Sequence, residues 1–466
     1  MRPALVTITF LALSALAGGA ASAQPAQPAP PTPPAPVFGA PVFVLTGGGL
    51  GHGVGMSQWG AYGQASEGKS YADILAYYYR GTELGQASVT KVRVLVAAGR
   101  KQLVLSSRAP FRVRDAAGVV FDLPAGTLTL RPELVVPIDG IPAPLLGPLT
   151  FLPANGSRLS LGPVEYRGEL RVLSDGAKLQ AVNVLGLEGY LLGVVPREMP
   201  SGWPLEALKA QAVAARTYAL AKLVQGESFD LYADGRSQVY GGVGAEAPGT
   251  TQAVRETTGQ VVLYEGSVAT TLFFSSSGGR TARAIDIFGL DLPYLDSVPD
   301  PWDEASPHHV WQPQLLTAKQ IATAFKLSAP VVDVQVGPTA YDRVGLLTLA
   351  TKAGDIVEVS PVEFRSRLAL RSTAFRLGVL RLGKSAASIA PGARIRLTGV
   401  ARDVQDAVLE KLGADGLWVP IARLVLQQDG TFTTVLRPKE TSRYRLVASG
   451  LAGPALTVKV ASGAES

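Results

Sequence analysis

Residues 189–218, GYLLGVVPREMPSGWPLEALKAQAVAARTY, contain the pattern that decides the fold and the candidate site. Glu198 lies between Pro196 and Pro200, after an apolar run and before an alanine-rich segment. The two prolines predict a rigid turn around Glu198 that is poor in water. Such surroundings raise the pKa of a carboxyl group and favour a role as a general acid.

The alanine-rich segment predicts a helix over residues 204–225, with Pro204 in its first turn. Apolar residues at helical spacing should face the core: Leu205, Leu208, Ala212, Ala215, Ala219 and Leu223. Arg216 lies on a different face, and it points toward Glu198 only if the chain doubles back. On spacing alone, Arg216 is equally well explained as a solvated or ion-paired helix residue.

The chain opens with the pattern of a secretory signal over residues 1–23. Arg2 precedes an apolar run, and Ala21, Ser22 and Ala23 supply small residues for cleavage before Gln24. The alternative is an uncleaved membrane anchor. No cysteine follows the apolar run, so a lipid anchor is not expected. We therefore expect the protein to be exported to the periplasm or the cell wall.

Composition bounds the class of protein. The chain has 466 residues, of which 47% are hydrophobic and 17% charged, and it has no cysteine. This predicts a globular protein of two or more domains without disulfides. The formal net charge of +6 suits an anionic cell-wall matrix without specifying one. Nucleic acid is not expected as a partner, because no basic run is interleaved with aromatic residues.

Turn signals divide the chain further. Residues 24–37 are rich in Pro, Ala and Gln and predict an extended linker. Residues 38–384 predict a mixed, sheet-rich α+β domain with a few helices. Residues 385–466 predict a small all-β sandwich of the Ig-like type. The individual elements expected are a helix at residues 71–79 with a capping box at Ser70 and Asp73, and strands at residues 92–96, 111–114, 170–173, 394–397, 432–436, 444–447 and 456–460.

Residues 184–220 resemble the core motif of the SpoIID/LytB family, the group of stage II sporulation protein D and the amidase enhancer. In that family EMP followed by EALKAQAVAARTYA is typical. Further segments resemble its signatures: GHGVGMSQWGA at residues 51–61, SQVYGG at 237–242, FSSSGGRT at 274–281 and PYL at 293–295. The resemblance extends over roughly residues 43–383.

The order of these segments departs from the familiar one. In the family GHGVGMSQ closes the domain, whereas here residues 43–84, which contain it, stand at the start. Residues 364–380 resemble the strand that normally leads into GHGVGMSQ. A circular permutation explains this order and is tolerated when the ends of a domain lie close together. If the chain is permuted, His52 and Gln58 lie near Glu198 in space.

The resemblance implies a lytic transglycosylase, which cleaves between N-acetylmuramic acid and N-acetylglucosamine and leaves a 1,6-anhydro end. Hydrolytic glycosidases need two carboxyl groups, whereas this reaction needs one, because the sugar's 6-hydroxyl replaces water. It implies Glu198 as acid and base, with Arg216 organising the site. The alternative is a non-catalytic wall-binding enhancer of an amidase. The expected partners are peptidoglycan glycan strands and a cell-wall amidase.

Other residues are candidates for the site. Glu188, Glu206 and Asp234 are rival carboxyl groups, although surface exposure explains Glu188 and the helix dipole explains Glu206. The residues expected to contact glycan are His52, Gln58, Gln238, Tyr240, Ser275, Ser276, Ser277 and Tyr294. Their alternatives are a structural histidine, a turn of serines without the GxSxG elbow of a nucleophile, and aromatic core packing. Trp203 is a further aromatic that could stack on a sugar.

No cofactor, metal or nucleotide is expected. The glycine-rich residues 47–55 lack the Gly-Lys-Ser/Thr ending of a phosphate loop. His308 and His309 are adjacent, so in an extended chain they point to opposite sides. Some relatives carry Cys and His near QVYGG, but residues 232–238 contain neither, so a zinc site is not expected.

Overall fold

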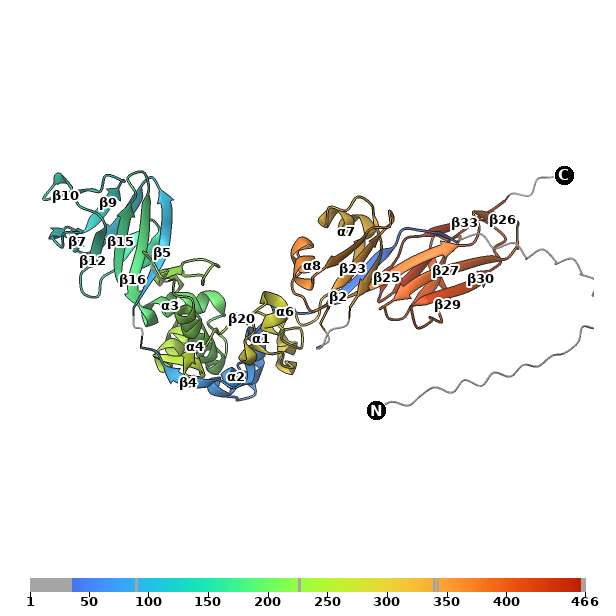
Figure 1. Ribbon diagram of the computed structural model, residues 1–466, viewed down its shortest axis with the longest axis horizontal. Helices are drawn as coiled ribbons and strands as arrows, with labels where there is room; N and C mark the ends of the chain where they lie inside the picture. Colours follow the sequence, from blue (N-terminus) through green and yellow to red (C-terminus); the bar gives the residue numbers. More distant parts are fainter. Residues whose placement is uncertain (1–35, 89–90, 225–227, 338–340, 342, 462–466) are drawn as a thin grey trace, which may run out of the picture.

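The computed structural model describes residues 36–461 except 89–90, 225–227, 338–340 and 342. The predicted signal peptide and residues 24–35 of the predicted linker lie outside this range. None of the helices described in it is both long and apolar enough to cross a membrane. Figure 1 shows an elongated row of lobes, with a β-rich lobe at one end, helices at the bend and further β-rich lobes at the other end. The mixture confirms the predicted α+β, sheet-rich fold class.

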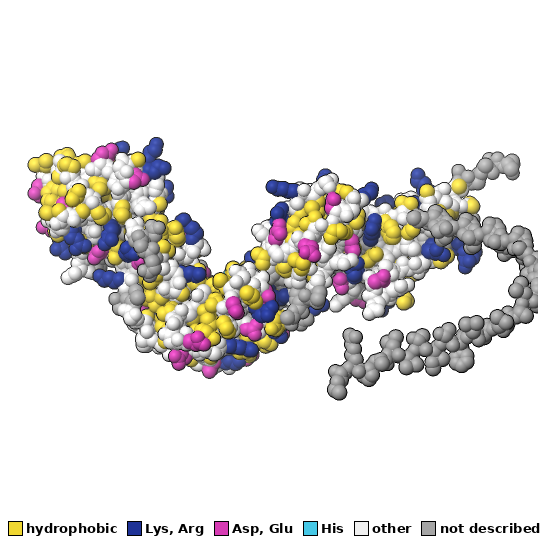
Figure 2. Space-filling view, viewed as in Figure 1, with side chains coloured by type: hydrophobic (Ala, Val, Ile, Leu, Met, Phe, Trp, Pro, Cys, Tyr) yellow, Lys and Arg dark blue, Asp and Glu magenta, His cyan; other side chains and the backbone are white. Residues whose placement is uncertain are grey.

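Charged side chains are spread over these lobes. On the face shown in Figure 2, Lys and Arg are interspersed with Asp and Glu rather than gathered on one lobe.

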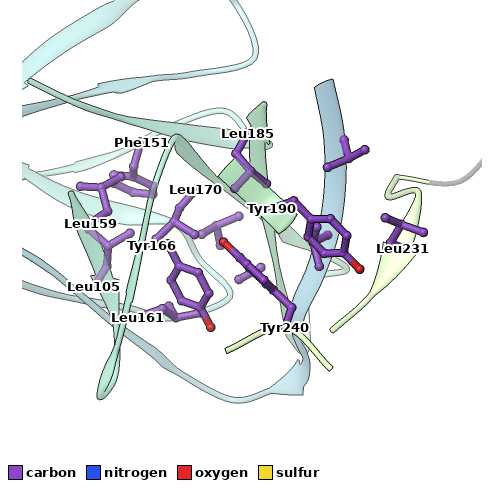
Figure 3. Packing of buried hydrophobic residues seen from close by; sticks show 14 of the residues in the cluster. Leu105, Phe151, Leu159, Leu161, Tyr166, Leu170, Leu185, Tyr190, Leu231 and Tyr240 are labelled. Carbon is purple, nitrogen blue, oxygen red and sulfur yellow. The ribbon is translucent and has the colours of Figure 1, made fainter. Parts of the chain in front are cut away.

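The β-rich lobe between residues 91 and 186 contains two sheets and a hairpin. The first sheet has the order β17 (Leu231–Tyr232), β5 (Lys91–Arg100), β16 (Leu179–Gly186), β15 (Glu169–Ser174), β12 (Leu149–Pro153), β7 (Phe111–Arg114) and β8 (Val120–Leu123). The second has β14 (Val164–Tyr166), β13 (Leu159–Leu161), β6 (Leu103–Ser107) and β9 (Gly126–Leu130), and the hairpin is β10 (Val135–Ile138) with β11 (Ile141–Pro144). The three strands predicted here are confirmed. The inward side chains of the two sheets form one hydrophobic core, part of which is shown in Figure 3.

That core continues into the helices through three tyrosines. Tyr166 of β14, Tyr240, and Tyr190 of α3 (Leu187–Glu198) belong to the same cluster, with ring centroids 5.9 Å apart for Tyr166 and Tyr240 and 5.2 Å apart for Tyr190 and Tyr240 (Figure 3). The Tyr240 hydroxyl also donates to Asn183 Oδ1 at 2.9 Å. Aromatic pairs of this kind add about 0.5–1.5 kcal/mol beyond the burial of their area. They fix α3, and therefore Glu198 at its end, against the β lobe.

The middle of the molecule is helical. Its elements are α1 (Gln58–Ser66), α2 (Tyr71–Tyr78), α3, α4 (Leu205–Ala221), α5 (Pro248–Glu256) and α6 (Ala284–Phe288), the short strands β3 (Met56–Ser57), β4 (Glu83–Gln86), β18 (Gln260–Tyr264), β19 (Ser267–Val268) and β20 (Phe273–Phe274), and the 3-10 turns η1 (Val243–Ala245), η2 (Pro293–Leu295) and η3 (Pro301–Ala305). The predicted capping box of Ser70 and Asp73 at the start of α2 is confirmed. The alanine-rich α4 contacts α1, α2, α3 and α5, because small side chains let neighbours approach on several sides.

One local prediction is wrong. Glu198 is the last residue of α3, and Pro196 lies inside the last turn of that helix rather than in a turn of its own. Pro200 disfavours the helical conformation for the residue before it, and Met199 is accordingly extended at φ −137° and ψ 137°. The helix therefore ends where the chain approaches Pro200, and the turn follows Glu198.

The lobes at the other end share one sheet, in the order β21 (Gln314–Thr317), β2 (Val42–Gly47), β25 (Phe375–Lys384), β27 (Ile395–Arg402) and β30 (Thr431–Leu436), with β1 (Val37–Phe38) also paired to β25. One core on this sheet includes α7 (Ala318–Ala324), β22 (Val331–Val336), β23 (Leu347–Thr351), β24 (Ile356–Val359) and α8 (Pro361–Arg367). The other core faces the sheet of β26 (Ser388–Ile389), β33 (Leu456–Val460), β31 (Ser442–Ala448), β28 (Val408–Leu412) and β29 (Trp418–Arg423), with β32 (Leu451–Ala452) paired to β31.

This shared sheet crosses the border predicted between residues 384 and 385. In β25, Leu377 and Val379 face one core while Leu380 and Leu382 face the other, so the strand is buried on both faces. Because β25 pairs with β2 on one side and β27 on the other, the sandwich is continuous with the preceding lobe. The four strands predicted in this part are present as β27, β30, β31 and β33.

The same sheet bears on the order of the family segments. β2, which leads into GHGVGMSQ, is the antiparallel neighbour of β25, with Val42 opposite Leu380 and Gly47 opposite Phe375. The start of the predicted permuted segment and the end of the resembling region are thus adjacent strands. This is the proximity that a permutation requires, and the permutation itself stays a proposal.

Candidate functional site

Glu198 occupies a sheltered position at the carboxyl end of α3. Its side chain is half-buried, and burial raises its pKa above the ordinary value, while the backbone N–H of Val239 donates to the carboxyl and offsets part of that rise. Burial raises the pKa values of Tyr190 and Tyr218, and the negative charge of nearby Glu198 raises them further. The carboxyl group is therefore held in an aromatic environment that favours its protonated form.

Glu198 also differs from its rivals in charge pairing. Each of the other three carboxyl groups considered has a basic partner: Glu188 with Arg216, Glu206 with Lys209, and Asp234 with Arg236. Among the residues that the structure describes, Glu198 has no ion pair. A carboxyl group without a counter-charge keeps its proton more readily, as a general acid requires.

Gln58 brings the GHGVGMSQ segment to Glu198. Its amide Nε2 donates to the backbone oxygen of Glu198 at 3.0 Å and to Gln211 Oε1 at 3.3 Å. The expectation that Gln58 lies near Glu198 is thus confirmed. Since Gln58 is only 8% exposed and both contacts are to protein, the structure gives it a positioning role at the end of α3.

His52 has both ring nitrogens occupied by protein. Nδ1 accepts the Val54 backbone N–H at 3.1 Å, so Nε2 carries the proton and donates to the Phe273 oxygen at 3.0 Å. Burial lowers the pKa of His52 to about 4, so the ring is neutral near pH 7. These contacts correct the expectation of glycan binding and match the alternative of a structural histidine.

Arg216 is committed elsewhere. Its guanidinium is fully buried and donates to Glu188 through Nε at 2.8 Å and through a terminal nitrogen at 2.6 Å, and it also donates to the oxygens of Gln260 and Val254. The helix turns Arg216 toward the start of α3, about three turns from Glu198 at the other end. The contacts correct the expected site role and match the ion-paired alternative.

Most of the other expected glycan contacts are inside the protein. Five of the expected contact residues are at most 7% exposed: Gln238, Tyr240, Ser276, Ser277 and Tyr294. Each makes a hydrogen bond within the chain, which favours the alternatives of turn structure and core packing. The polar side chains that suggested substrate contacts form hydrogen bonds with other buried polar groups here. Ser275 differs, because it is half-buried and accepts the Trp59 backbone N–H at 3.0 Å through its own backbone oxygen.

Two buried aspartates contact the serine loop, and sequence reasoning missed them: Asp303 through its side chain, and Asp300 through its backbone N–H, which donates to the Gly279 oxygen at 2.8 Å. Asp303 is fully buried and accepts hydrogen bonds from Ser57 Oγ at 3.2 Å, Ser276 Oγ at 2.9 Å and the Ser277 backbone N–H at 3.0 Å. Burial raises the pKa of Asp300 to about 6. Asp303 thereby joins Ser57, the residue before α1, to the serine loop. The sequence feature that could have indicated these aspartates is the Asp-Pro-Trp-Asp run of residues 300–303.

Aromatic side chains pair with one another on α4, on α1 and in the turn that follows Glu198. Tyr218 of α4 lies 6.2 Å from Phe273 of β20, measured between ring centroids. Trp59 and Tyr62 of α1 lie 4.8 Å and 5.0 Å from Trp203, which follows Glu198 in the turn before α4. The described part of the chain contains no group of three or more His, Asp or Glu residues arranged so that it could hold a metal ion.

The fold and site define an α+β protein in which a helix end presents one unpaired, half-buried carboxyl group among aromatic rings. Residues 175–264, which span the end of β15 through β18, match the family model described as SpoIID, stage II sporulation protein. This match and the relatives below establish that the chain contains a domain of the SpoIID/LytB family.

The relatives share only part of their length with this chain. An uncharacterized protein of Brachyspira hyodysenteriae is 39% identical over 142 residues, which are 30% of this chain and 39% of that protein. The amidase enhancer of Bacillus subtilis is 38% identical over 163 residues, 32% of this chain and 22% of the enhancer. Stage II sporulation protein D of Bacillus amyloliquefaciens is 31% identical over 222 residues, 42% of this chain and 61% of that protein.

Proposed function

We propose that this protein is an exported lytic transglycosylase that cleaves peptidoglycan glycan strands between N-acetylmuramic acid and N-acetylglucosamine. The observation that carries the proposal is the environment of Glu198, a half-buried carboxyl group whose pKa is raised by burial and which has no ion pair in the described residues. One protonated carboxyl group is what this reaction needs, whereas hydrolysis by the usual route needs two.

In the proposed reaction Glu198 acts twice. As an acid it gives its proton to the glycosidic oxygen, and the bond from that oxygen to the anomeric carbon of N-acetylmuramic acid breaks. As a carboxylate it then accepts the proton of the 6-hydroxyl of the same sugar, whose oxygen bonds to the anomeric carbon. No water is consumed, the product ends in a 1,6-anhydro ring, and Glu198 is protonated again.

Gln58 supports this role from beside the acid. Its hydrogen bond to the Glu198 backbone oxygen occupies an acceptor at the end of α3 and fixes where the side chain starts. Arg216 takes no step in the proposal, because its contacts hold Glu188 instead.

The cellular setting is part of the proposal. The signal pattern at residues 1–23 supports export from the cytoplasm to where peptidoglycan is found. Relatives named amidase enhancer and stage II sporulation protein D favour a wall-directed role.

The test is incubation of the purified protein with glycan strands stripped of their stem peptides, followed by mass spectrometry of the ends. We expect 1,6-anhydro ends with the unaltered protein and a loss of about 10²–10⁴-fold in rate with Glu198→Gln. Asp234→Asn is the matched control, since Asp234 is an exposed carboxyl group paired with Arg236. Full activity of Glu198→Gln would eliminate the proposed acid.

A second candidate is a non-catalytic protein that enhances a cell-wall amidase. The 38% identity to the amidase enhancer of Bacillus subtilis favours it. It predicts binding to wall sacculi and faster cleavage by a purified amidase, with no anhydro ends and no effect of Glu198→Gln. The same preparations therefore separate the two candidates.

A further inference from the structure

Three aromatic side chains on α1 and in the turn that follows Glu198 form a compact group, which we call the aromatic triad: Trp59, Tyr62 and Trp203. Their ring centroids are 4.8 Å apart for Trp59 and Trp203, 5.0 Å for Tyr62 and Trp203, and 5.4 Å for Trp59 and Tyr62. Interplanar angles of 57–64° show that the rings meet at a tilt. Each ring therefore presents a face or an edge away from its neighbours.

The triad is not part of the hydrophobic interior. All three side chains are half-buried, and Trp59 and Tyr62 belong to none of the hydrophobic clusters found in the described residues, whereas Trp203 packs at the margin of one. Trp311 shows the contrast, since it is 5% exposed and its indole donates to the Gly49 oxygen at 2.9 Å. Large apolar side chains left partly in water beside a reactive group are typical of a ligand site.

The chain fixes the triad next to Glu198 from two sides. Trp59 directly follows Gln58, whose side chain donates to the Glu198 backbone oxygen, and the Trp59 N–H donates to Ser275. Trp203 is five residues beyond Glu198, at the end of a turn that its own N–H closes onto the Pro200 oxygen at 3.1 Å. The elements that place the acid therefore also place the aromatic rings.

We propose that the aromatic triad is a saccharide subsite that packs against the apolar C–H faces of pyranose rings in a β-1,4-linked N-acetylhexosamine strand. This rests on the proposed function, since it assigns the part of the same site that holds the strand. The pyranose rings of N-acetylhexosamines carry C–H bonds on their faces, and N-acetylglucosamine has no charge, so aromatic rings bind it without an ion pair. The tilt between the three rings suits successive sugars of a strand, which turn over at each linkage.

The test measures binding separately from turnover. The probe is chitotetraose, a β-1,4-linked tetramer of N-acetylglucosamine, titrated by calorimetry into the Glu198→Gln protein so that no reaction occurs. We expect Trp59→Ala and Trp203→Ala each to raise Kd by about tenfold or more, and Trp59→Phe to restore part of the loss. Tyr62→Ala repeats the test at a separate position of α1 and decides the matter if either tryptophan variant fails to fold by circular dichroism.

Trp418→Ala is the matched control, because Trp418 lies in β29 of the sandwich and packs under Arg445 at 4.3 Å. Unchanged Kd in the triad variants, or no binding of the probe by the Glu198→Gln protein, overturns the subsite. Loss of amidase stimulation with sugar binding intact also overturns it, in favour of a protein partner. If the unaltered protein forms anhydro ends but Kd is unchanged in the triad variants, the subsite is refuted and the proposed reaction stands. If the triad variants lose binding but the unaltered protein forms no anhydro ends, the proposed reaction is refuted and the subsite stands.

Discussion

The pair of Arg216 and Glu188 allows a prediction in which burial decides which of two substitutions destabilises the protein more. Arg216 is fully buried, while the Glu188 side chain is 34% exposed, and two hydrogen bonds of 2.8 Å and 2.6 Å join them. Glu188→Gln leaves a buried guanidinium without a counter-charge. Arg216→Met instead leaves a carboxylate that reaches water and keeps the Gly259 N–H at 3.1 Å. The two variants should therefore differ, although they break the same pair.

The magnitudes follow from these exposures. An uncompensated buried charge costs about 3–5 kcal/mol, so Glu188→Gln should destabilise α4 by about 3 kcal/mol. For Arg216→Met we expect about 1–2 kcal/mol, because solvent screens the remaining carboxylate and the main loss is the hydrogen bonds to Gln260 and Val254. The double variant should be no less stable than Glu188→Gln alone, since it removes the stranded charge.

Hydrogen exchange of peptides from α4 and β18 measures this locally, as a chain of several lobes need not unfold in one step. Glu188→Gln should speed exchange by about 100-fold and Arg216→Met by about tenfold. Arg236→Met removes an exposed pair, 62% and 57% accessible, and should change nothing. Equal effects of the two single variants, or the reverse order, would refute the reasoning from burial.

Three further predictions concern the site and its support. Because burial raises the pKa of Glu198 above 4.5, its acid form should persist above that pH. The rate of anhydro-product formation should therefore begin to fall only above pH 4.5 as the pH is raised. A fall that begins at or below pH 4.5 would contradict this. The pKa of Asp300 is about 6 in the folded protein and 3.8 in the unfolded chain, so its contribution to stability is complete below pH 3.8 and is lost as pH rises through 6. Between pH 4.5 and 7.5 the melting temperature of Asp300→Asn should therefore fall less than that of the unaltered protein. Parallel curves of melting temperature against pH would disprove the assignment. Gly55→Ala should cost about 2 kcal/mol or more, because φ is +79° and the new Cβ would lie 2.1 Å from the Leu272 oxygen. Gly81→Ala, with φ +71° and open space around it, should cost only about 1 kcal/mol. Hydrogen exchange of peptides from α1 and α2 measures both costs locally, and equal costs would count against the steric argument.

Local sequence patterns predicted the elements well where a short stretch sets its own conformation. The capping box at Ser70 and Asp73 and the alternating strand Phe111–Arg114 are found as expected. The turn expected around Glu198 was wrong because Pro196 is accommodated in the last turn of a helix that the β lobe supports, and only the following Pro200 ends it. A proline pattern alone does not say which of two prolines terminates a helix.

The candidate site was predictable in its centre and less so around it. Glu198 was found from its motif, and its neighbour Gln58 from the resemblance of a distant segment. The serine loop suggested ligand contacts because hydroxyl groups serve equally well to bind a substrate or to satisfy a buried carboxylate. Asp303 accepts hydrogen bonds from Ser57 and Ser276, so these hydroxyl groups satisfy a buried carboxylate.

By itself, the sequence determined the classes of element, the α+β composition and the one carboxyl group on which the proposed chemistry depends, because these follow from local periodicity and from a contiguous motif. Tertiary structure alone decided that Arg216 binds Glu188, that His52 is a neutral structural residue, and that Trp59 meets Trp203 beside Glu198. The physical reason is that these contacts join different segments of the chain, 28 residues apart for Arg216 and Glu188 and 221 for His52 and Phe273, which only the folded core brings together.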